Sequence, residues 1–151
     1  IQMTSASYIR FNPIQDTPCF HQTDGGAGLE GYEQKRDCTV RTLAVACELS
    51  YSEAYRILKA DGRPDNQCWS MPNFMEANKS IGGFEFQQVV FRSKFTVNSF
   101  LNAHPRGRFI VKVDRHVFAV IDGMRYDTHM LGDLMDVQYA WKLTKKEKRD
   151  E

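Results

Sequence analysis

One stretch limits the fold of this chain more than any other: residues 107–128, which read GRFIVKVDRHVFAVIDGMRYDT. Asp122 and Gly123 are typical of a two-residue hairpin turn, because both turn positions need the positive φ angles that this pair accepts. Every position from Val117 to Ile121 is apolar, so both faces of that strand must be covered and the strand must be central. Antiparallel strands are therefore expected at 108–113, 116–121 and 124–128.

The segments before these strands are mostly helical in pattern, with capping residues at the helix starts and glycine or proline at the ends. Four helices are expected: one after Asp37, one from the Ser50 and Glu53 capping box to Gly62, one from Ser70 to Gly82, and one closed by Pro105. The other elements are a strand at 7–11, a loop over 12–36, and strands over 84–91 and near VQYAWKL. Helices followed by an antiparallel meander indicate an α+β fold.

Length and charge narrow the class of protein. The 151 residues, of which 42% are hydrophobic, suit a single domain, expected over 1–143 and followed by a charged tail at 144–151. The 20 basic and 19 acidic residues leave a net charge of +1, which is too weak a field to predict nucleic acid as a partner. No apolar run reaches the roughly 18 residues of a membrane span and no export signal is visible, so a cytoplasmic protein without a membrane partner is expected.

The four cysteines are spaced irregularly and are expected to be free thiols. Cys19 and His21 form a Cys-x-His pair, but no second pair completes the four ligands of a structural zinc site, so no metal is predicted. Cys38 directly follows the predicted N-cap, where unpaired N–H groups and the positive end of the helix dipole favour a thiolate. The alternative is that Cys38 is one more small buried apolar side chain, as Cys47 is expected to be.

A catalytic cysteine needs a base, and the chain has four histidines. His21 lies in the long loop, His104 at a helix end and His129 at the far end of a strand. His116 alone begins the covered central strand, where its ring keeps access to solvent while the surrounding dielectric is low. A core histidine with satisfied hydrogen bonds is the alternative interpretation of His116.

Asp127 is the predicted partner of His116. The hairpin turn makes Phe118 face Asp127, and facing residues of an antiparallel pair share one side of the sheet, as alternate residues of a strand do. His116, Phe118 and Asp127 should therefore project the same way, and a carboxylate there would orient the imidazole. Asp122, at the turn, lies roughly 20 Å away along the strand at about 3.3 Å per residue and is expected to be structural.

Two blocks, DCTVRTLAVACELSYSEAY and the stretch over 107–128, resemble the papain-like cysteine peptidase superfamily, and in particular short papain-fold proteins of bacteria and their phages. The resemblance implies N-terminal helices packed on a C-terminal antiparallel meander. It also implies Cys38 as nucleophile, His116 as general base and an orienting acid after it. Papain-like enzymes usually carry an oxyanion glutamine about six residues before the cysteine. Tyr32 stands there and Gln34 is the nearest glutamine, so both are candidate donors beside the Cys38 N–H.

The expected function is a cysteine hydrolase of the peptidase or amidase type, which acts on a protein or peptide through a thioester intermediate and needs no cofactor. The same three residues also support acyl transfer, transglutamination or glutamine deamidation, because only the second nucleophile and the binding groove differ. A papain-fold binding module without activity is the alternative from another class, since a fold alone does not determine function.

Overall fold

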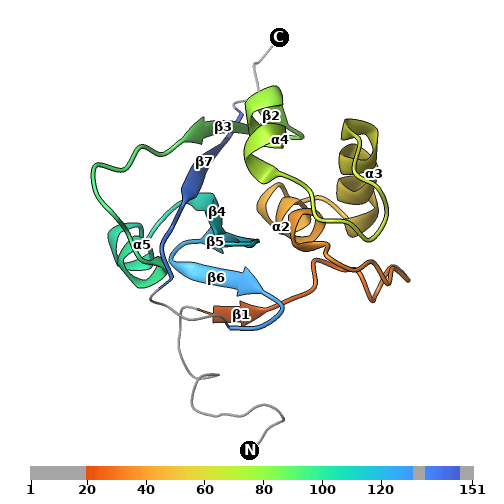
Figure 1. Ribbon diagram of the computed structural model, residues 1–151, viewed down its shortest axis with the longest axis horizontal. Helices are drawn as coiled ribbons and strands as arrows, with labels where there is room; N and C mark the ends of the chain where they lie inside the picture. Colours follow the sequence, from red (N-terminus) through yellow and green to blue (C-terminus); the bar gives the residue numbers. More distant parts are fainter. Residues whose placement is uncertain (1–19, 131–134, 147–151) are drawn as a thin grey trace, which may run out of the picture.

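The computed structural model describes residues 20–130 and 135–146, and within these ranges the chain has the predicted α+β fold (Figure 1). Its helices are α2 (Cys38–Ala46), α3 (Tyr51–Asp61), α4 (Met71–Ala77) and α5 (Val97–Ala103). Its strands are β1 (Phe20–Gln22), β2 (Ser80–Ile81), β3 (Phe84–Gln88), β4 (Arg108–Val113), β5 (His116–Ile121), β6 (Met124–Asp127) and β7 (Tyr139–Lys145). None of these helices is long and apolar enough to cross a bilayer.

The strands form one seven-stranded sheet in the order β1-β6-β5-β4-β7-β3-β2. β4, β5 and β6 make the predicted antiparallel meander, β7 pairs antiparallel with β4 on its other side, and β1 is parallel to β6. Asp122 and Gly123 have φ angles of 51° and 77°, as the predicted turn requires. Ile121 faces Met124 across this turn, which confirms the predicted register.

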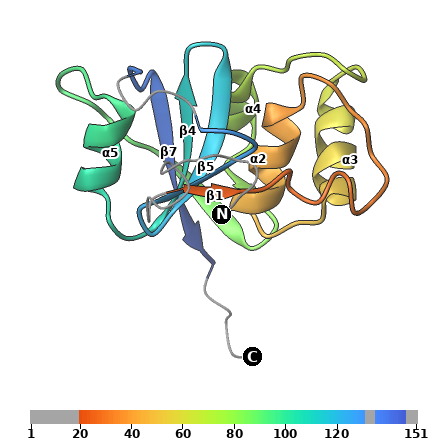
Figure 2. The same ribbon diagram turned by 90° about the horizontal axis from the view of Figure 1, so that it is seen from below.

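Helices cover both faces of the sheet: α2, α3 and α4 lie on one side and α5 lies on the other (Figures 1 and 2). Alternate residues of β4 and β5 point to the two sides. Ile110 and Val117 pack into the core on the side of α2, α3 and α4, whereas Val111 and Phe118 pack into the core on the side of α5. The central strands are apolar at successive positions because a different layer buries each face.

Hydrogen bonds join α2 to the sheet and set the start of α3. The hydroxyl of Thr42 donates to the backbone carbonyl of Val117 at 3.1 Å, in a buried contact that joins α2 to the start of β5. Ser50 and Glu53 form the predicted capping box at the start of α3, and Gly62 ends that helix. The first residue of α2 is thereby held close to the first residue of β5.

The third helix is shorter than predicted, since α4 stops at Ala77 and not at Gly82. The side-chain amide of Asn78 donates to the carbonyl of Phe74 at 2.9 Å and caps the helix end. The next residues form β2, which pairs with β3 around a glycine turn. Tertiary pairing with the sheet therefore outweighs the helical pattern of this segment.

The strand boundaries also differ from the predicted ones. β1 lies within the segment expected to be a loop, because its three residues gain strand geometry only by pairing with β6. β3 ends at Gln88, earlier than the predicted 91. β7 runs to Lys145, so the start of the predicted charged tail belongs to the sheet. The strand predicted at 7–11 lies outside the described residues.

Candidate active site

Cys38, His116 and Asp127 lie together in the structure, each at the end of an element. Cys38 begins α2, His116 begins β5 and Asp127 ends β6. Nε2 of His116 is 2.7 Å from Oδ2 of Asp127, which leaves Nδ1 as the ring nitrogen for a second partner. Cys38 lines the same pocket as His116, and the pKa of each of these two groups depends on the other. The three side chains therefore form one cluster, in which His116 is hydrogen-bonded to Asp127 and shares a pocket with Cys38.

Asp127 is held in place on both of its oxygens. Oδ2 contacts His116, and Oδ1 accepts the backbone N–H of Thr128 at 2.8 Å. The residue is only 4% exposed, so its carboxylate is shielded from water. Asp122 instead accepts the N–H of Gly107 at 2.9 Å and stays at the hairpin turn. The two aspartates thus occupy the places that the register predicted for them.

The protonation states of Cys38 and His116 depend on each other. Burial raises the pKa of the Cys38 thiol, but the hydrogen bond with His116 and the positive charge of that ring lower it by more, so the pKa falls below its usual value. Burial lowers the pKa of His116, but hydrogen bonds with Asp127 and Cys38 outweigh it and raise the pKa to about 9. Each group therefore shifts the other toward the thiolate–imidazolium pair.

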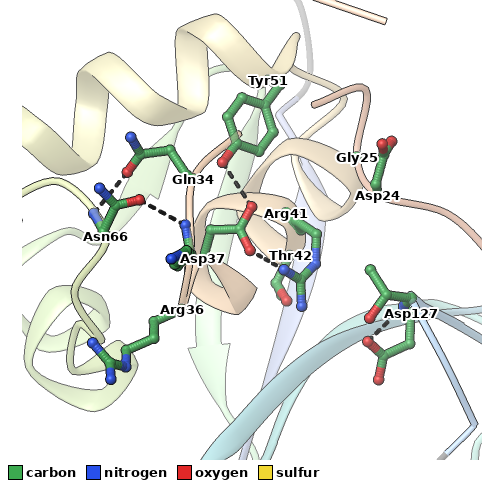
Figure 3. Close-up of polar contacts among 12 residues, drawn as sticks. Asp24, Gly25, Gln34, Arg36, Asp37, Arg41, Thr42, Tyr51, Asn66 and Asp127 are labelled. Carbon is green, nitrogen blue, oxygen red and sulfur yellow. Dashed lines mark hydrogen bonds and ion pairs between the residues drawn. The ribbon is translucent and has the colours of Figure 1, made fainter. Parts of the chain in front are cut away.

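Asp37 is the N-cap residue of α2, as predicted, but its side chain makes no capping hydrogen bond. One carboxylate oxygen accepts the hydroxyl of Tyr51 at 2.7 Å and the other forms an ion pair with Arg41 (Figure 3). The reason is that the fully buried Tyr51 requires an acceptor for its hydroxyl. The Asp37 carboxylate therefore does not accept from the N–H groups of the first turn. The N–H of Cys38 is among those that remain available to another acceptor.

Neither predicted side-chain oxyanion donor lines the pocket beside Cys38. The side chain of Gln34 turns toward Asn66, whose backbone N–H it accepts at 2.9 Å (Figure 3). The hydroxyl of Tyr32 donates to Ser52 at 3.1 Å, and its ring packs among neighbouring tyrosines. Tyr32 therefore ties the segment upstream of α2 to α3, and Gln34 ties it to the residues that follow α3.

The other three histidines have contacts of their own. His21 belongs to β1 and packs beside Tyr126 of β6. Burial, together with the charge of a nearby lysine, lowers the pKa of His104 at the end of α5. The ring of His129 is centred 6.3 Å from that of His116, and its Nδ1 contacts the neighbouring threonine hydroxyl. Cys19 lies outside the described residues, which contain no group of three or more side chains suited to a metal ion.

A pocket of about 380 Å³ opens beside Cys38 and His116. Trp69 and Met71 supply apolar surface from the segment that leads into α4, and Lys112 and Arg115 add positive charge from the β4–β5 hairpin. The sequence did not predict these residues, because the two segments meet only in the fold. The only sequence signal for this pocket was an aromatic residue and a methionine near a helix start. Such side chains pack in a core more often than they line a pocket.

The lowered pKa of Cys38 predicts selective labelling of this thiol. Iodoacetamide at pH 6 should alkylate Cys38 much faster than Cys47, because burial raises the pKa of Cys47 to about 12. Trypsin places the two residues on separate peptides, 37–41 and 42–56, so mass spectrometry can follow each. The His116→Ala variant should label slowly at the same pH, since it loses the cation that stabilises the thiolate. Equal labelling of both cysteines would contradict the lowered pKa.

Comparisons of the chain with protein families, with curated proteins and with solved structures found no match. No family membership therefore supports a role for the site. Its chemistry follows from a thiol with a lowered pKa and an imidazole that line one pocket, and from the buried carboxylate that pairs with the imidazole.

Proposed function

We propose that this protein is a papain-like cysteine hydrolase that cleaves peptide or amide bonds. The observation that carries the proposal is the placement of Cys38 in one open pocket with His116, whose ring is hydrogen-bonded to the buried Asp127. Nucleophile, base and orienting acid in this order are what acyl transfer through a cysteine requires. Strongly perturbed titratable groups that share a cleft are also typical of functional sites.

The reaction follows from the protonation states. The Cys38 thiolate attacks the carbonyl carbon of the substrate, and the imidazolium of His116 then donates its proton to the departing amine. The product is a thioester between the acyl group and Cys38. A water molecule, deprotonated by His116, attacks this thioester, releases the acid and restores the thiol pair. Asp127 keeps the ring oriented and stabilises its positive charge in both steps.

The helix start supplies the oxyanion donors in this proposal. The first backbone hydrogen bond of α2 runs from the N–H of Arg41 to the carbonyl of Asp37, at 3.0 Å. The N–H groups of Cys38, Thr39 and Val40 precede it and have no partner within the helix. Since the Asp37 carboxylate is engaged elsewhere, the N–H of Cys38 can donate to the oxyanion that forms at the carbonyl under attack.

The pocket predicts a substrate with an apolar side chain next to an acidic group, because its apolar wall adjoins Lys112 and Arg115. Arg115 has a φ of 59°, which asparagine accepts, so Arg115→Asn removes the charge without straining the backbone. An exposed ion pair is worth up to about 1 kcal/mol, so this variant should lose roughly fivefold in kcat/KM on acidic peptides. Peptides with lysine in place of the acid should show no such loss. Arg106→Asn, an exposed change ahead of β4, is the matched control.

The test of the proposed function is to incubate the protein with a peptide library in water enriched in ¹⁸O. Hydrolysis should yield cleaved peptides whose new carboxylates carry one heavy oxygen, and the Cys38→Ala variant should yield none. With a primary amine added, acyl transfer would instead give amide products without the label. Labelled glutamate in uncleaved peptides would indicate deamidation. A library left intact by a protein whose Cys38 is readily alkylated would refute the hydrolase.

A binding module without turnover is the second candidate, and one observation favours it. Gln34 and Tyr32 both point to other partners, so the site lacks the side-chain oxyanion donor that papain-like enzymes usually carry. Such a module would bind peptides in the same pocket with equal affinity before and after Cys38→Ala, and no product would accumulate. Binding measured by calorimetry alongside the library assay separates the two candidates.

A further inference from the structure

Cys68 is a second thiol that lines the pocket beside Cys38. It belongs to the exposed segment between α3 and α4, whereas Cys38 begins α2. Cys38 is half-buried, Cys68 is exposed, and both are free thiols. The proposed hydrolysis assigns no role to Cys68, so its presence in the pocket calls for a separate explanation.

A partly buried hydrogen bond holds the residues that follow the two cysteines next to each other. The hydroxyl of Thr39 donates to the backbone carbonyl of Trp69 at 3.1 Å. Thr39 is only 2% exposed, and the hydrogen bond is partly buried. Because Thr39 follows Cys38 and Trp69 follows Cys68, the bond sets the two cysteine-bearing segments side by side.

A buried arginine holds the residues on the preceding side in the same way. Arg63 is 2% exposed and donates to the carbonyl of Gln67 at 3.0 Å, directly before Cys68. It also donates to the carbonyl of Arg36 at 3.4 Å, two positions before Cys38. The side chain of Gln34 and the backbone of Asn66 add a further link between the same segments (Figure 3). Cross-links therefore lie on both sides of the cysteine pair.

We propose that Cys38 and Cys68 form a reversible intramolecular disulfide, through which a peroxide turns the site off and a dithiol turns it on again. A disulfide requires Cα atoms about 4.4–6.8 Å apart, which suits residues on two cross-linked neighbouring segments. The side chain of Cys68 is exposed, so it can turn toward Cys38 without disturbing the core.

The chemistry balances with hydrogen peroxide as the oxidant. The Cys38 thiolate attacks one peroxide oxygen, the O–O bond breaks, and a sulfenic acid forms while hydroxide leaves and takes up a proton as water. The thiol of Cys68 then loses its proton and attacks the sulfur of Cys38. The S–O bond breaks, a second water leaves and the S–S bond forms. Two thiols and one peroxide give one disulfide and two waters, with two electrons passed to the peroxide.

The environments of the cysteines suit these two roles. The lowered pKa of Cys38 supplies the thiolate that reacts with peroxide, while Cys47, with its pKa raised to about 12, does not compete. The exposed Cys68 acts as the resolving thiol, which captures the sulfenic acid before it reaches the irreversible sulfinic state. The inference uses the thiolate of the proposed function but not its turnover, so it is testable without a substrate.

The experiment treats the reduced full-length protein with a slight excess of hydrogen peroxide and then blocks free thiols with N-ethylmaleimide. Trypsin separates Cys19, Cys38, Cys47 and Cys68 onto peptides 11–35, 37–41, 42–56 and 60–79, because Pro64 prevents cleavage after Arg63. The expected product is peptide 37–41 joined to peptide 60–79, with a mass two hydrogens below the sum. Iodoacetamide labelling of Cys38 should disappear with peroxide and return in full with dithiothreitol.

Two variants make the result decisive. Cys68→Ser, at an exposed position, should keep its melting temperature, but peroxide should convert its Cys38 to sulfinic acid, and dithiothreitol should not restore labelling. Cys47→Ala should still form the linked peptides. Sulfinic acid at Cys38 in the wild-type protein without the linked peptides would overturn the inference and leave the proposed hydrolase standing. A Cys38 that neither alkylates nor oxidises would overturn both.

Discussion

Replacing Cys38 with alanine is expected to abolish peptide hydrolysis, with a fall in kcat on the order of 10⁴-fold or more. Cys38 is the pocket thiol whose pKa His116 lowers, and His116 in turn pairs with Asp127, so the proposed reaction depends on this side chain. The loss should appear in kcat, with KM little changed, since the thiol forms a bond to the substrate only during the reaction. Steady-state kinetics on the best peptide of the library measures it.

Cys47→Ala is the matched control, because the two cysteines belong to one helix and its immediate end. Cys47 is buried in the core under α2, so this change should lower the melting temperature and leave kcat within about twofold. If Cys38→Ala keeps its activity while folded, the thioester mechanism is wrong, and a different group carries the reaction.

Removing the carboxylate of Asp127 is expected to have the next largest effect. Asp127→Ala leaves Nε2 of His116 without its acceptor and should lower kcat by on the order of 10²- to 10⁴-fold, the range of an intact acid–base group. Asp127→Asn keeps an acceptor oxygen but removes the charge, so its loss should be smaller. The fall in kcat of Asp127→Asn measures the loss of the charge that stabilises the imidazolium. The additional fall in Asp127→Ala measures the loss of the acceptor that orients the ring.

The pH profile gives a second readout for Asp127→Asn. The pKa of His116 is raised to about 9 by partners that include Asp127, so the alkaline limb of kcat/KM should lie near that pH in the wild-type protein. Without the charge, burial lowers the pKa of His116, and the alkaline limb should move to lower pH. An unchanged limb would show that Asp127 does not act through the imidazole.

Asp122→Asn is the control for the second aspartate of the same hairpin. Its carboxylate accepts the N–H of Gly107 and its φ is positive, and asparagine satisfies both conditions. The variant should therefore keep its pH profile and its kcat, with at most a small drop in melting temperature. A greater loss of activity in Asp122→Asn than in Asp127→Asn would refute both the role and the register.

Some features of the site could be predicted from the sequence because local rules decide them. The Asp122-Gly123 pair specifies a tight turn, the turn specifies the register, and the register puts Asp127 on the side of His116. The Ser50 and Glu53 capping box sets the start of α3 in the same local way. These predictions depend on neighbours within a few residues of each other, whose geometry the backbone itself restricts.

Other features were decided only by the tertiary structure, because they depend on which buried polar groups compete for one another. Asp37 lies where a helix cap is expected, yet the buried hydroxyl of Tyr51 claims its carboxylate. Gln34 is the nearest glutamine to Cys38, yet Asn66 and Arg63 hold it away from the pocket. Unsatisfied buried donors cost more free energy than a lost cap, so the packed interior decides these partners.

The sequence by itself therefore determined the class of fold, the hairpin and the pair formed by His116 and Asp127, whose strands are adjacent in the chain. The contact of Cys38 with His116, the pocket that Trp69 and Arg115 share, and the place of Cys68 within it required the whole fold. The physical reason is that these groups come from segments far apart in the chain, and only burial of a common core fixes their relative positions.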